Sequence, residues 1–237
     1  MGSRRHDAGS GLTTDTAAPP RKATLILWPR TSLSGSAPRV APSLLGSVIR
    51  SGDVAIRLTE VEAYAGSQDP GSHAYRGPTP RTQIMFGEAG FAYVYFSYGM
   101  HYCLNVVCGP VGTASAVLLR GGEVIDGLEI ARSRRDAGRS RPHRGRDLAR
   151  GPARLASALG VDLHHKGLDL CDPSSMVRLE TGGACLGDAV TAGPRVGVSG
   201  PGGDGTIYPW RFWIDGDPTV STYRAAKTRP PRSPRSH

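Results

Sequence analysis

Two runs of aromatic and β-branched residues constrain this fold more than any other feature of the sequence. They span residues 92–97 and 102–107, and only the four residues 98–101 (Tyr-Gly-Met-His) lie between them. Strand-forming runs separated by a short, glycine-containing segment are typical of a β-hairpin. The sequence therefore predicts a hairpin near the middle of the chain.

Other strands and helices are predicted from periodicity and from end signals. Asp126, with Glu129 three residues later, resembles a helix N-terminus with Asp126 as the cap. Pro152 and Gly160 bracket a second, short helix. Further strands are expected at 54–64, 114–120, 194–198 and 210–214. Together these elements predict a single compact domain with a loop-rich, mixed α/β core.

The distribution of charge separates flexible segments from a folded core. The chain has a net charge of +9 and a pI of about 9.8. Residues 1–22, 131–150 and 222–237 contribute +2, +6 and +5, which leaves the remainder at −4. We expect a disordered tail at 1–22, a folded domain at 23–221 with a basic loop at 131–150, and a basic flexible tail at 222–237. Such segments suit contact with nucleic-acid phosphates, although arginine-rich tails can also reflect codon bias.

Cysteine usage and hydropathy indicate a reducing compartment. None of the four cysteines forms a C-x-x-C pair or stands near a histidine pair at zinc-like spacing. The first apolar run, 23–28, is too short for a signal peptide, and no run approaches the ~20 apolar residues that cross a bilayer. We expect a cytoplasmic protein with no membrane partner and no structural zinc, and a monomer by default.

The run 54–64 places two carboxylates on one side of a predicted strand. Side chains at i, i+2 and i+4 of a strand face the same way, so Glu60, Glu62 and Tyr64 share a face. Paired carboxylates at the inner end of a strand are costly unless they are used, and His73 follows in the next loop. This segment alone is equally compatible with a solvated strand edge and an ordinary loop histidine.

Tyrosines concentrate on the predicted hairpin. Tyr93 and Tyr95 lie on one face of its first strand, and Tyr98 falls at its tip, where a large aromatic side chain has no core to enter. An exposed aromatic tip can act as a wedge in a stack of bases. An ordinary aromatic strand with one surface tyrosine explains the same residues, and the paired glutamates favour the first interpretation.

Short sequence runs recur in an order that characterises one enzyme family. The first half of the chain carries Thr-Glu-Val-Glu-Ala-Tyr at 59–64, Thr-Pro-Arg at 79–81, Met-Phe at 85–86, Tyr-Val-Tyr at 93–95, Tyr-Gly-Met at 98–100, Cys-Leu-Asn at 103–105 and Leu-Leu-Arg at 118–120. The second half carries Gly-Pro-Ala-Arg-Leu at 151–155, Arg-Val-Gly-Val at 195–198 and Pro-Trp-Arg-Phe at 209–212. Together they resemble the alkyladenine (3-methyladenine, methylpurine) DNA glycosylase family.

This resemblance implies both a fold and a reaction. The fold would be a curved, mostly antiparallel sheet surrounded by helices, with the hairpin protruding into the DNA minor groove. The reaction would release alkylated or deaminated purines from double-stranded DNA and leave an abasic site. The lesions would include 3-methyladenine, 7-methylguanine, hypoxanthine and ethenoadenine. A base inside a duplex hides its glycosidic bond, so such an enzyme must flip it out.

The resemblance also implies catalytic roles. Glu62 would be the general base that activates the attacking water. Arg120 and the backbone carbonyl of Val196 would hold that water. An unperturbed glutamate is already ionised at neutral pH, so it needs no large pKa shift to act as a base.

Four further residues would hold the flipped base. Tyr64 and His73 would flank one face of the base, and Tyr95 the other. Asn105 would crowd the amino group of normal guanine and so help to reject it. Stacking between aromatic faces favours cationic alkylated purines.

Five residues are expected to contact DNA. The resemblance implies that Tyr98 fills the gap that the flipped base leaves. Met100 and His101, beside it on the hairpin, and Arg81 and Met85, in the preceding loop, complete the predicted DNA surface.

Lysines are scarce, and this bears on the mechanism. Only three of the 29 basic residues are lysines, and none lies between Lys22 and Lys166, the interval that holds most of the predicted site. Glycosylases that also cut the strand form a Schiff base through an amine. We expect an enzyme that stops at the abasic site and uses neither a metal nor another cofactor.

Two other functions fit parts of the same sequence. A metal-dependent nuclease would use Glu60, Glu62, Asp69 and His73 as ligands. A module that binds damaged DNA without turnover would need the aromatic hairpin and the basic tails, but not Glu62 with Arg120.

Overall fold

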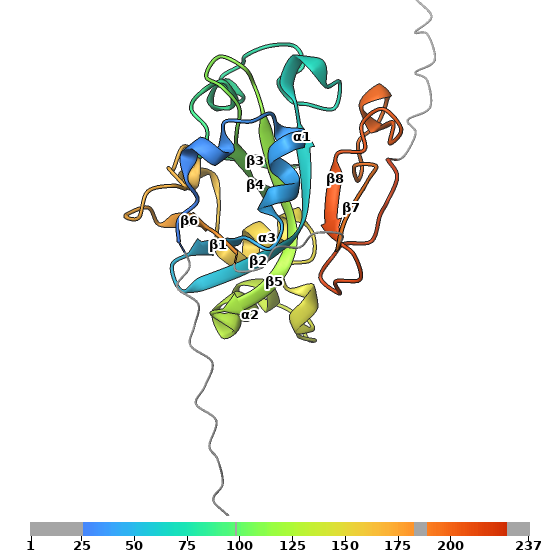
Figure 1. The fold of residues 1–237 in the computed structure, drawn as a ribbon. Helices are drawn as coiled ribbons and strands as arrows, with labels where there is room; N and C mark the ends of the chain where they lie inside the picture. The colour runs from blue at the N-terminus through green and yellow to red at the C-terminus, as the bar shows by residue number, and fades with distance from the viewer. Residues whose placement is uncertain (1–25, 98, 183–188, 227–237) are drawn as a thin grey trace, which may run out of the picture.

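The computed structural model describes residues 26–97, 99–182 and 189–226 (Figure 1). The predicted tail 1–22, Tyr98 at the hairpin tip and most of the predicted tail 222–237 lie outside these ranges. In the described part of the chain, no helix is long and apolar enough to cross a membrane.

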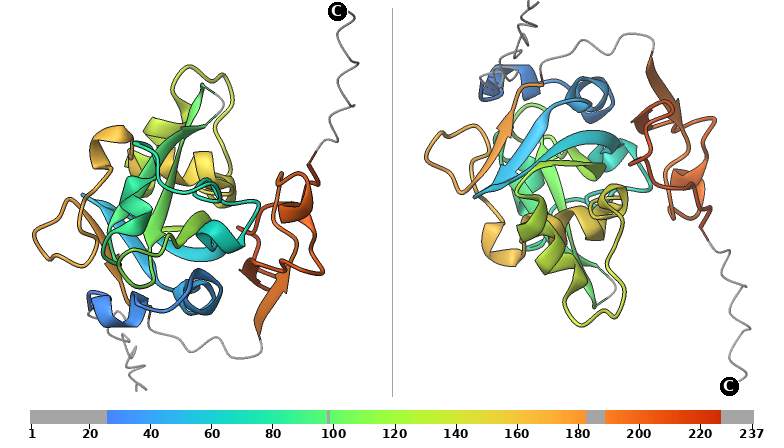
Figure 2. Two further views of the ribbon diagram at one scale, coloured as in Figure 1. Left: turned by 90° about the horizontal axis from the view of Figure 1, so that it is seen from above. Right: turned by 90° about the horizontal axis from the view of Figure 1, so that it is seen from below.

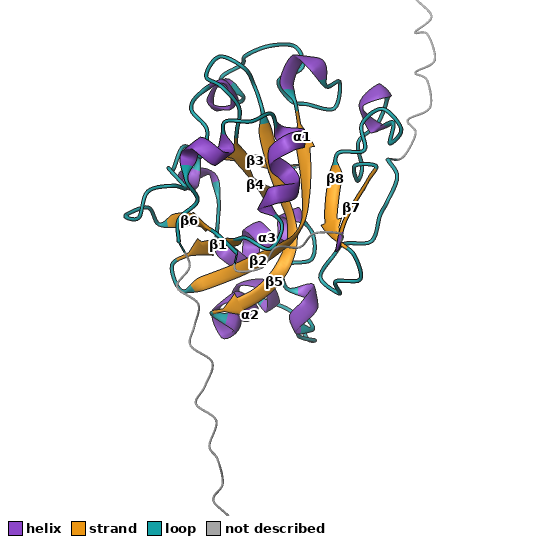
Figure 3. Ribbon diagram, viewed as in Figure 1, coloured by secondary structure: helices purple, strands orange, loops and turns teal. Residues whose placement is uncertain are grey.

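One antiparallel sheet organises the structure (Figure 3). Six strands follow the order β3-β4-β5-β2-β1-β6, and β8 joins β2 and pairs with β7. The strands are β1 (Val48–Ser51), β2 (Val54–Tyr64), β3 (Ala92–Ser97), β4 (His101–Val107), β5 (Ala116–Asp126), β6 (Val177–Glu180), β7 (Val190–Gly193) and β8 (Arg211–Ile214). The predicted hairpin is confirmed as β3–β4, and so is the curved, mostly antiparallel sheet of a mixed α/β domain.

Short helices cover both faces of this sheet. In Figure 1, α1 (Ala37–Val40) lies in front of the central strands and α3 (Pro152–Leu159) lies behind them, and the views of Figure 2 agree. The predicted helix from Pro152 is confirmed, and Gly160 ends it with a φ of +71°. Next to α3 lies α2 (Leu128–Asp136). Single 3-10 turns occupy Arg30–Leu33, Ala41–Leu44, Gly66–Gln68, Gln83–Phe86, Gly145–Asp147, Leu163–His165 and Pro201–Gly203.

A bend in β2 divides this strand between two sets of neighbours. The register of β2 against β5 shifts on both sides of Glu60, and such irregularities bend a strand. On the β5 side, a Cβ at Gly122 would lie 2.3 Å from a backbone oxygen of Arg57, so only glycine permits this approach. Residues 54–57 of β2 pair with β1, whereas 60–62 pair with β8. The bend therefore places the glutamate segment between β5 and β8.

Two predicted elements are wrong in detail. The helix cap is Gly127, with a φ of +66° and no side-chain cap, because β5 continues through Asp126. The predicted strand at 194–198 is a loop, and the strand in this region is β7. The side chain of Arg195 is buried, the amide of Val196 binds a side chain, and Gly197 has a φ of +70°. These features are incompatible with a regular strand ladder.

The core predicts a large cost for truncating a central side chain. Leu119 of β5 is fully buried in the main core cluster. Leu119→Ala should lower the free energy of unfolding by ~2–5 kcal/mol, because it leaves a cavity that the sheet cannot fill. Urea denaturation measures this loss. Leu163→Ala is the control, because Leu163 is 48% exposed and its truncation should change stability by less than about 0.5 kcal/mol. Equal effects of the two substitutions would contradict the assigned core.

Candidate active site

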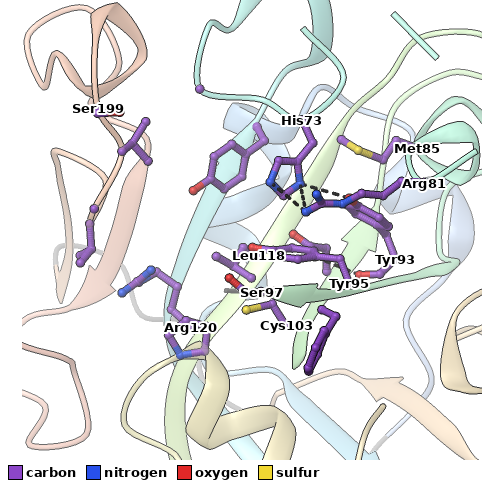
Figure 4. Close-up of a pocket in the computed structure, with 18 of the residues that line it drawn as sticks. His73, Arg81, Met85, Tyr93, Tyr95, Ser97, Cys103, Leu118, Arg120 and Ser199 are labelled. Atoms are coloured by element: carbon purple, nitrogen blue, oxygen red, sulfur yellow. Dashed lines mark hydrogen bonds between the residues drawn. The ribbon is translucent and has the colours of Figure 1, made fainter. Parts of the chain in front are cut away.

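A cavity of about 630 Å³ opens where the end of β2 meets β3, β4 and β5 (Figure 4). Its wall also includes side chains from the loop after β2 and from residues 196–199, so only folding brings these segments together. Eight of the predicted site residues line it: Tyr64, His73, Arg81, Met85, Tyr95, Asn105, Arg120 and Val196.

Glu62 lies directly behind the cavity wall, and its side chain is fully buried. Its Oε1 accepts a hydrogen bond from the backbone amide of Val196 at 2.7 Å, and its Oε2 accepts one from the hydroxyl of Tyr64 at 2.8 Å. Nη1 of Arg120 lies 3.3 Å from Oε2. All three partners line the cavity. The carboxylate is thus held one residue layer from the space that a ligand would enter.

The donors around Glu62 remain protonated at neutral pH. Burial alone would lower the pKa of Arg120, but Glu62 and Glu60 outweigh this effect and raise it above its ordinary value. Burial, together with the Glu62 carboxylate, raises the pKa of Tyr64 well above its ordinary value. Charge-assisted hydrogen bonds of this kind are stronger than neutral ones.

Glu60 is fully buried, does not line the cavity and orients Arg120. Its Oε1 accepts hydrogen bonds from Nε of Arg120 at 2.9 Å and from Nε of Arg211 at 2.7 Å, and the amide of Ser221 binds Oε2 at 2.7 Å. Burial would raise the pKa of Glu60, but Arg120 and Arg211 outweigh it and hold the pKa below its ordinary value. The alternating pattern of β2 made Glu60 a candidate metal ligand in the sequence. Its actual partners Arg211 and Ser221 are far away in the chain, so no sequence pattern predicted them.

A buried ion pair anchors the loop that carries Val196. Arg195 and Asp69 are both fully buried, and two N–O contacts of 2.6 Å join them. The guanidinium also donates to two backbone carbonyls and lies 4.6 Å from the ring centroid of Tyr64. A Cβ at Gly71 would come within 2.6 Å of this guanidinium, which makes glycine necessary there. No local sequence signal links residues so far apart, so this support for the site was not predicted.

The opposite wall combines three rings and one cation (Figure 4). The ring of His73 meets Tyr95 edge-on, with centroids 4.7 Å apart, and its Nδ1 lies 3.1 Å from the hydroxyl of Tyr93. The guanidinium of Arg81 lies 5.0 Å from the Tyr95 centroid and contacts the His73 ring. Burial and then Arg81 lower the pKa of His73 to about 4. The imidazole is therefore neutral at physiological pH.

The remaining predicted residues fall in three places. Asn105 is buried in β4, where its amide donates to the backbone carbonyl of Tyr93 at 2.9 Å. Met85 is also buried and lines the cavity. Met100 and His101 are exposed next to the tip of the hairpin and border a separate groove with Arg135 and Arg154. In both views of Figure 2 this end of the hairpin lies beside the basic segment after α2.

The proposed nuclease ligands do not converge. Among the described residues, no group of three or more histidine, cysteine, aspartate or glutamate side chains is arranged to hold a metal ion. Arg195 binds both oxygens of Asp69, and the two oxygens of Glu60 bind Arg120, Arg211 and Ser221. The donor set therefore gives no support to the nuclease interpretation.

The Arg195–Asp69 pair generates a stability prediction. Asp69→Asn should lower the free energy of unfolding by ~3–5 kcal/mol, because it leaves the Arg195 charge buried without a carboxylate. Thermal or urea denaturation tests this. Asp53→Asn, in an exposed turn, is the matched control and should be nearly neutral. A variant as stable as the unsubstituted protein would show that the pair contributes nothing.

Comparison with known proteins gives a consistent result. A family model described as methylpurine-DNA glycosylase (MPG) matches residues 31–218. A provisionally named 3-methyladenine DNA glycosylase of Streptomyces avermitilis is 55% identical over 195 residues, which cover 80% of this chain and 88% of that protein. A protein of the same provisional name from Leifsonia xyli subsp. xyli is 50% identical over 219 residues, covering 90% and 97%. This chain belongs to the methylpurine-DNA glycosylase family.

Proposed function

We propose that this protein releases alkylated and deaminated purines from double-stranded DNA and stops at the abasic site. The substrates would be 3-methyladenine, 7-methylguanine, hypoxanthine and ethenoadenine. The observation that carries this proposal is the Glu62 carboxylate, held by Tyr64, Arg120 and Val196 at the edge of an aromatic cavity. Family membership supports the same reaction class, and action on chromosomal DNA is compatible with it.

The cavity offers aromatic surfaces to a base that has left the duplex. Flipping costs a few kcal/mol, and least for a poorly paired base. Each base–aromatic contact can return about 1–3 kcal/mol, and Tyr64, His73 and Tyr95 supply aromatic surface in the cavity wall. A neutral His73 imposes no charge repulsion on a cationic alkylated purine.

The chemical step needs one base and no covalent intermediate with the protein. The C1′–N bond breaks and its electron pair leaves with the purine, while the oxygen of water forms the new bond to C1′. Glu62 would accept the proton from this water, and its negative charge would stabilise the oxocarbenium character of the sugar. Arg120 and the carbonyl of Val196 would orient the water. No lysine is among the residues that line the cavity in the described part of the chain, in keeping with hydrolysis rather than a Schiff base.

Removal of the proposed base tests the function directly. Glu62→Gln should lower the single-turnover release of ethenoadenine or hypoxanthine from a duplex by roughly 10²–10⁴-fold, because general-base catalysis contributes about this much. Abasic sites are revealed by alkali, and each reaction is run both with and without a chelator. Glu88→Gln, at an exposed position, is the control and should keep full activity. Direct nicking that disappears with the chelator would instead identify a nuclease.

Asn105 provides a test of specificity. Asn105→Ser should raise the release of unmodified guanine relative to hypoxanthine by roughly tenfold, because the shorter side chain makes room for the exocyclic amino group. Asn105→Gln retains the amide and its bulk and should show no such gain. The test is the release of guanine from an undamaged duplex by each variant. Equal release by both variants would show that Asn105 does not determine specificity against guanine.

A further inference from the structure

Arg81 occupies a position that its sequence context did not indicate. The sequence predicts a contact with DNA for this residue, and the structure also places it among the residues that line the cavity. The guanidinium carbon is 5.0 Å from the centroid of Tyr95, and Nη2 lies 3.2 and 3.3 Å from the two ring nitrogens of His73. Figure 4 shows the side chain extending toward both rings.

This arrangement leaves no room for a base on the same face of Tyr95. A base between two parallel rings needs roughly 7 Å between them, because optimal carbon–carbon contact is ~3.5 Å on each side. His73 instead meets Tyr95 edge-on, with centroids 4.7 Å apart and an interplanar angle of 87°. The His73 ring and the Arg81 guanidinium, whose central carbon lies 5.0 Å from the Tyr95 centroid, thus both lie against the surface that a stacked purine would need.

The contacts that hold Arg81 are weak enough to be exchanged. Among the described residues, no carboxylate lies within ion-pair distance of its guanidinium. Its partners are one aromatic face and one imidazole, and the side chain remains exposed to solvent. Rotation of the exposed side chain can therefore move the guanidinium away from Tyr95.

The backbone around Arg81 is fixed, which confines the motion to the side chain. Thr79 and Thr82 bind each other reciprocally, with backbone amides donating to side-chain hydroxyls at 2.9 and 3.2 Å. Lys166 donates to the backbone carbonyls of Pro80 and Arg81 at 3.3 and 3.1 Å. The loop is thus held on both sides of the residue.

We propose that Arg81 is a gate for the base cavity: its guanidinium occupies the stacking face of Tyr95 and leaves it for the DNA backbone when a flipped purine enters. The inference rests on the proposed function. It makes Arg81 a specificity-determining residue, because every base must displace a cation that already stacks on Tyr95. A cationic alkylated purine also repels the guanidinium, so the lesion itself promotes opening.

If Arg81 is a gate, its removal should lower the affinity for undamaged DNA and raise the preference for damaged DNA. Arg81→Ala, measured in a Glu62→Gln background to prevent turnover, should bind an undamaged duplex more weakly, with a salt slope shallower by about 1. The ratio of its affinities for an ethenoadenine duplex and an undamaged duplex should rise by roughly two- to fivefold, because the competitor for the stacking face is gone. Arg81→Lys keeps the charge and should bind the undamaged duplex nearly normally, with the same increase in the ratio.

Two controls establish that the change in the ratio comes from the Arg81 contact. Arg76→Ala removes the same charge from an exposed position of the same loop and should leave the ratio unchanged. NMR titration of His73 should show a pKa that rises from about 4 in Arg81→Ala, because the neighbouring cation is lost. An unchanged His73 titration would contradict the contact itself.

The outcomes also distinguish the gate from the proposed function. A ratio that falls in Arg81→Ala would show that Arg81 is a permanent wall of the base site, and an unchanged ratio would show that it does not compete with the base. Either result overturns the gate while the protein with Glu62 intact still releases bases. No base release by that protein, together with equal affinity for damaged and undamaged duplexes, would overturn the proposed function instead.

Discussion

The contact of Arg120 with two buried carboxylates is the interaction on which the site depends. Arg120 binds Glu60 through Nε and approaches Glu62 through Nη1, and Arg211 supplies the second positive charge. Two carboxylates and two guanidiniums therefore balance in a nearly dry space. An unpaired charge at such depth costs several kcal/mol, so each member of this cluster holds the others in place. The result is a carboxylate in fixed orientation behind the cavity.

The bend in β2 makes this cluster possible. A regular strand would keep one pair of neighbours along its whole length, but the register shifts at Glu60 let β2 exchange β1 for β8. Residues of β8 and of the segment after it can then reach Glu60. The loop after β7 approaches from the same end and is anchored by the Arg195–Asp69 pair. The register shifts in β2 thus allow segments that are distant in the sequence to contribute to one site.

The elements that depend on local signals were predictable from the sequence. The β3–β4 hairpin and the helix between Pro152 and Gly160 lie where periodicity and end residues indicate. The strand predicted at 194–198 failed because its amide and side-chain contacts lead to other parts of the chain. Within the site, eight of the residues that line the cavity were predicted from a family resemblance, whereas Arg195, Tyr93 and the orienting role of Glu60 were not.

The sequence by itself determined the β3–β4 hairpin, the helix that begins at Pro152, the strand that carries Glu60, Glu62 and Tyr64, and the family to which the chain is related. These properties depend on spacing along the chain, which the periodicity of a strand or helix converts directly into geometry. Only the tertiary structure decided that Glu60 orients Arg120, whereas Glu62 contacts residues that line the cavity. The same holds for the position of the Arg81 guanidinium over the ring of Tyr95. Such assignments depend on which buried charges find partners across the sheet, and this is settled by packing between residues far apart in the sequence.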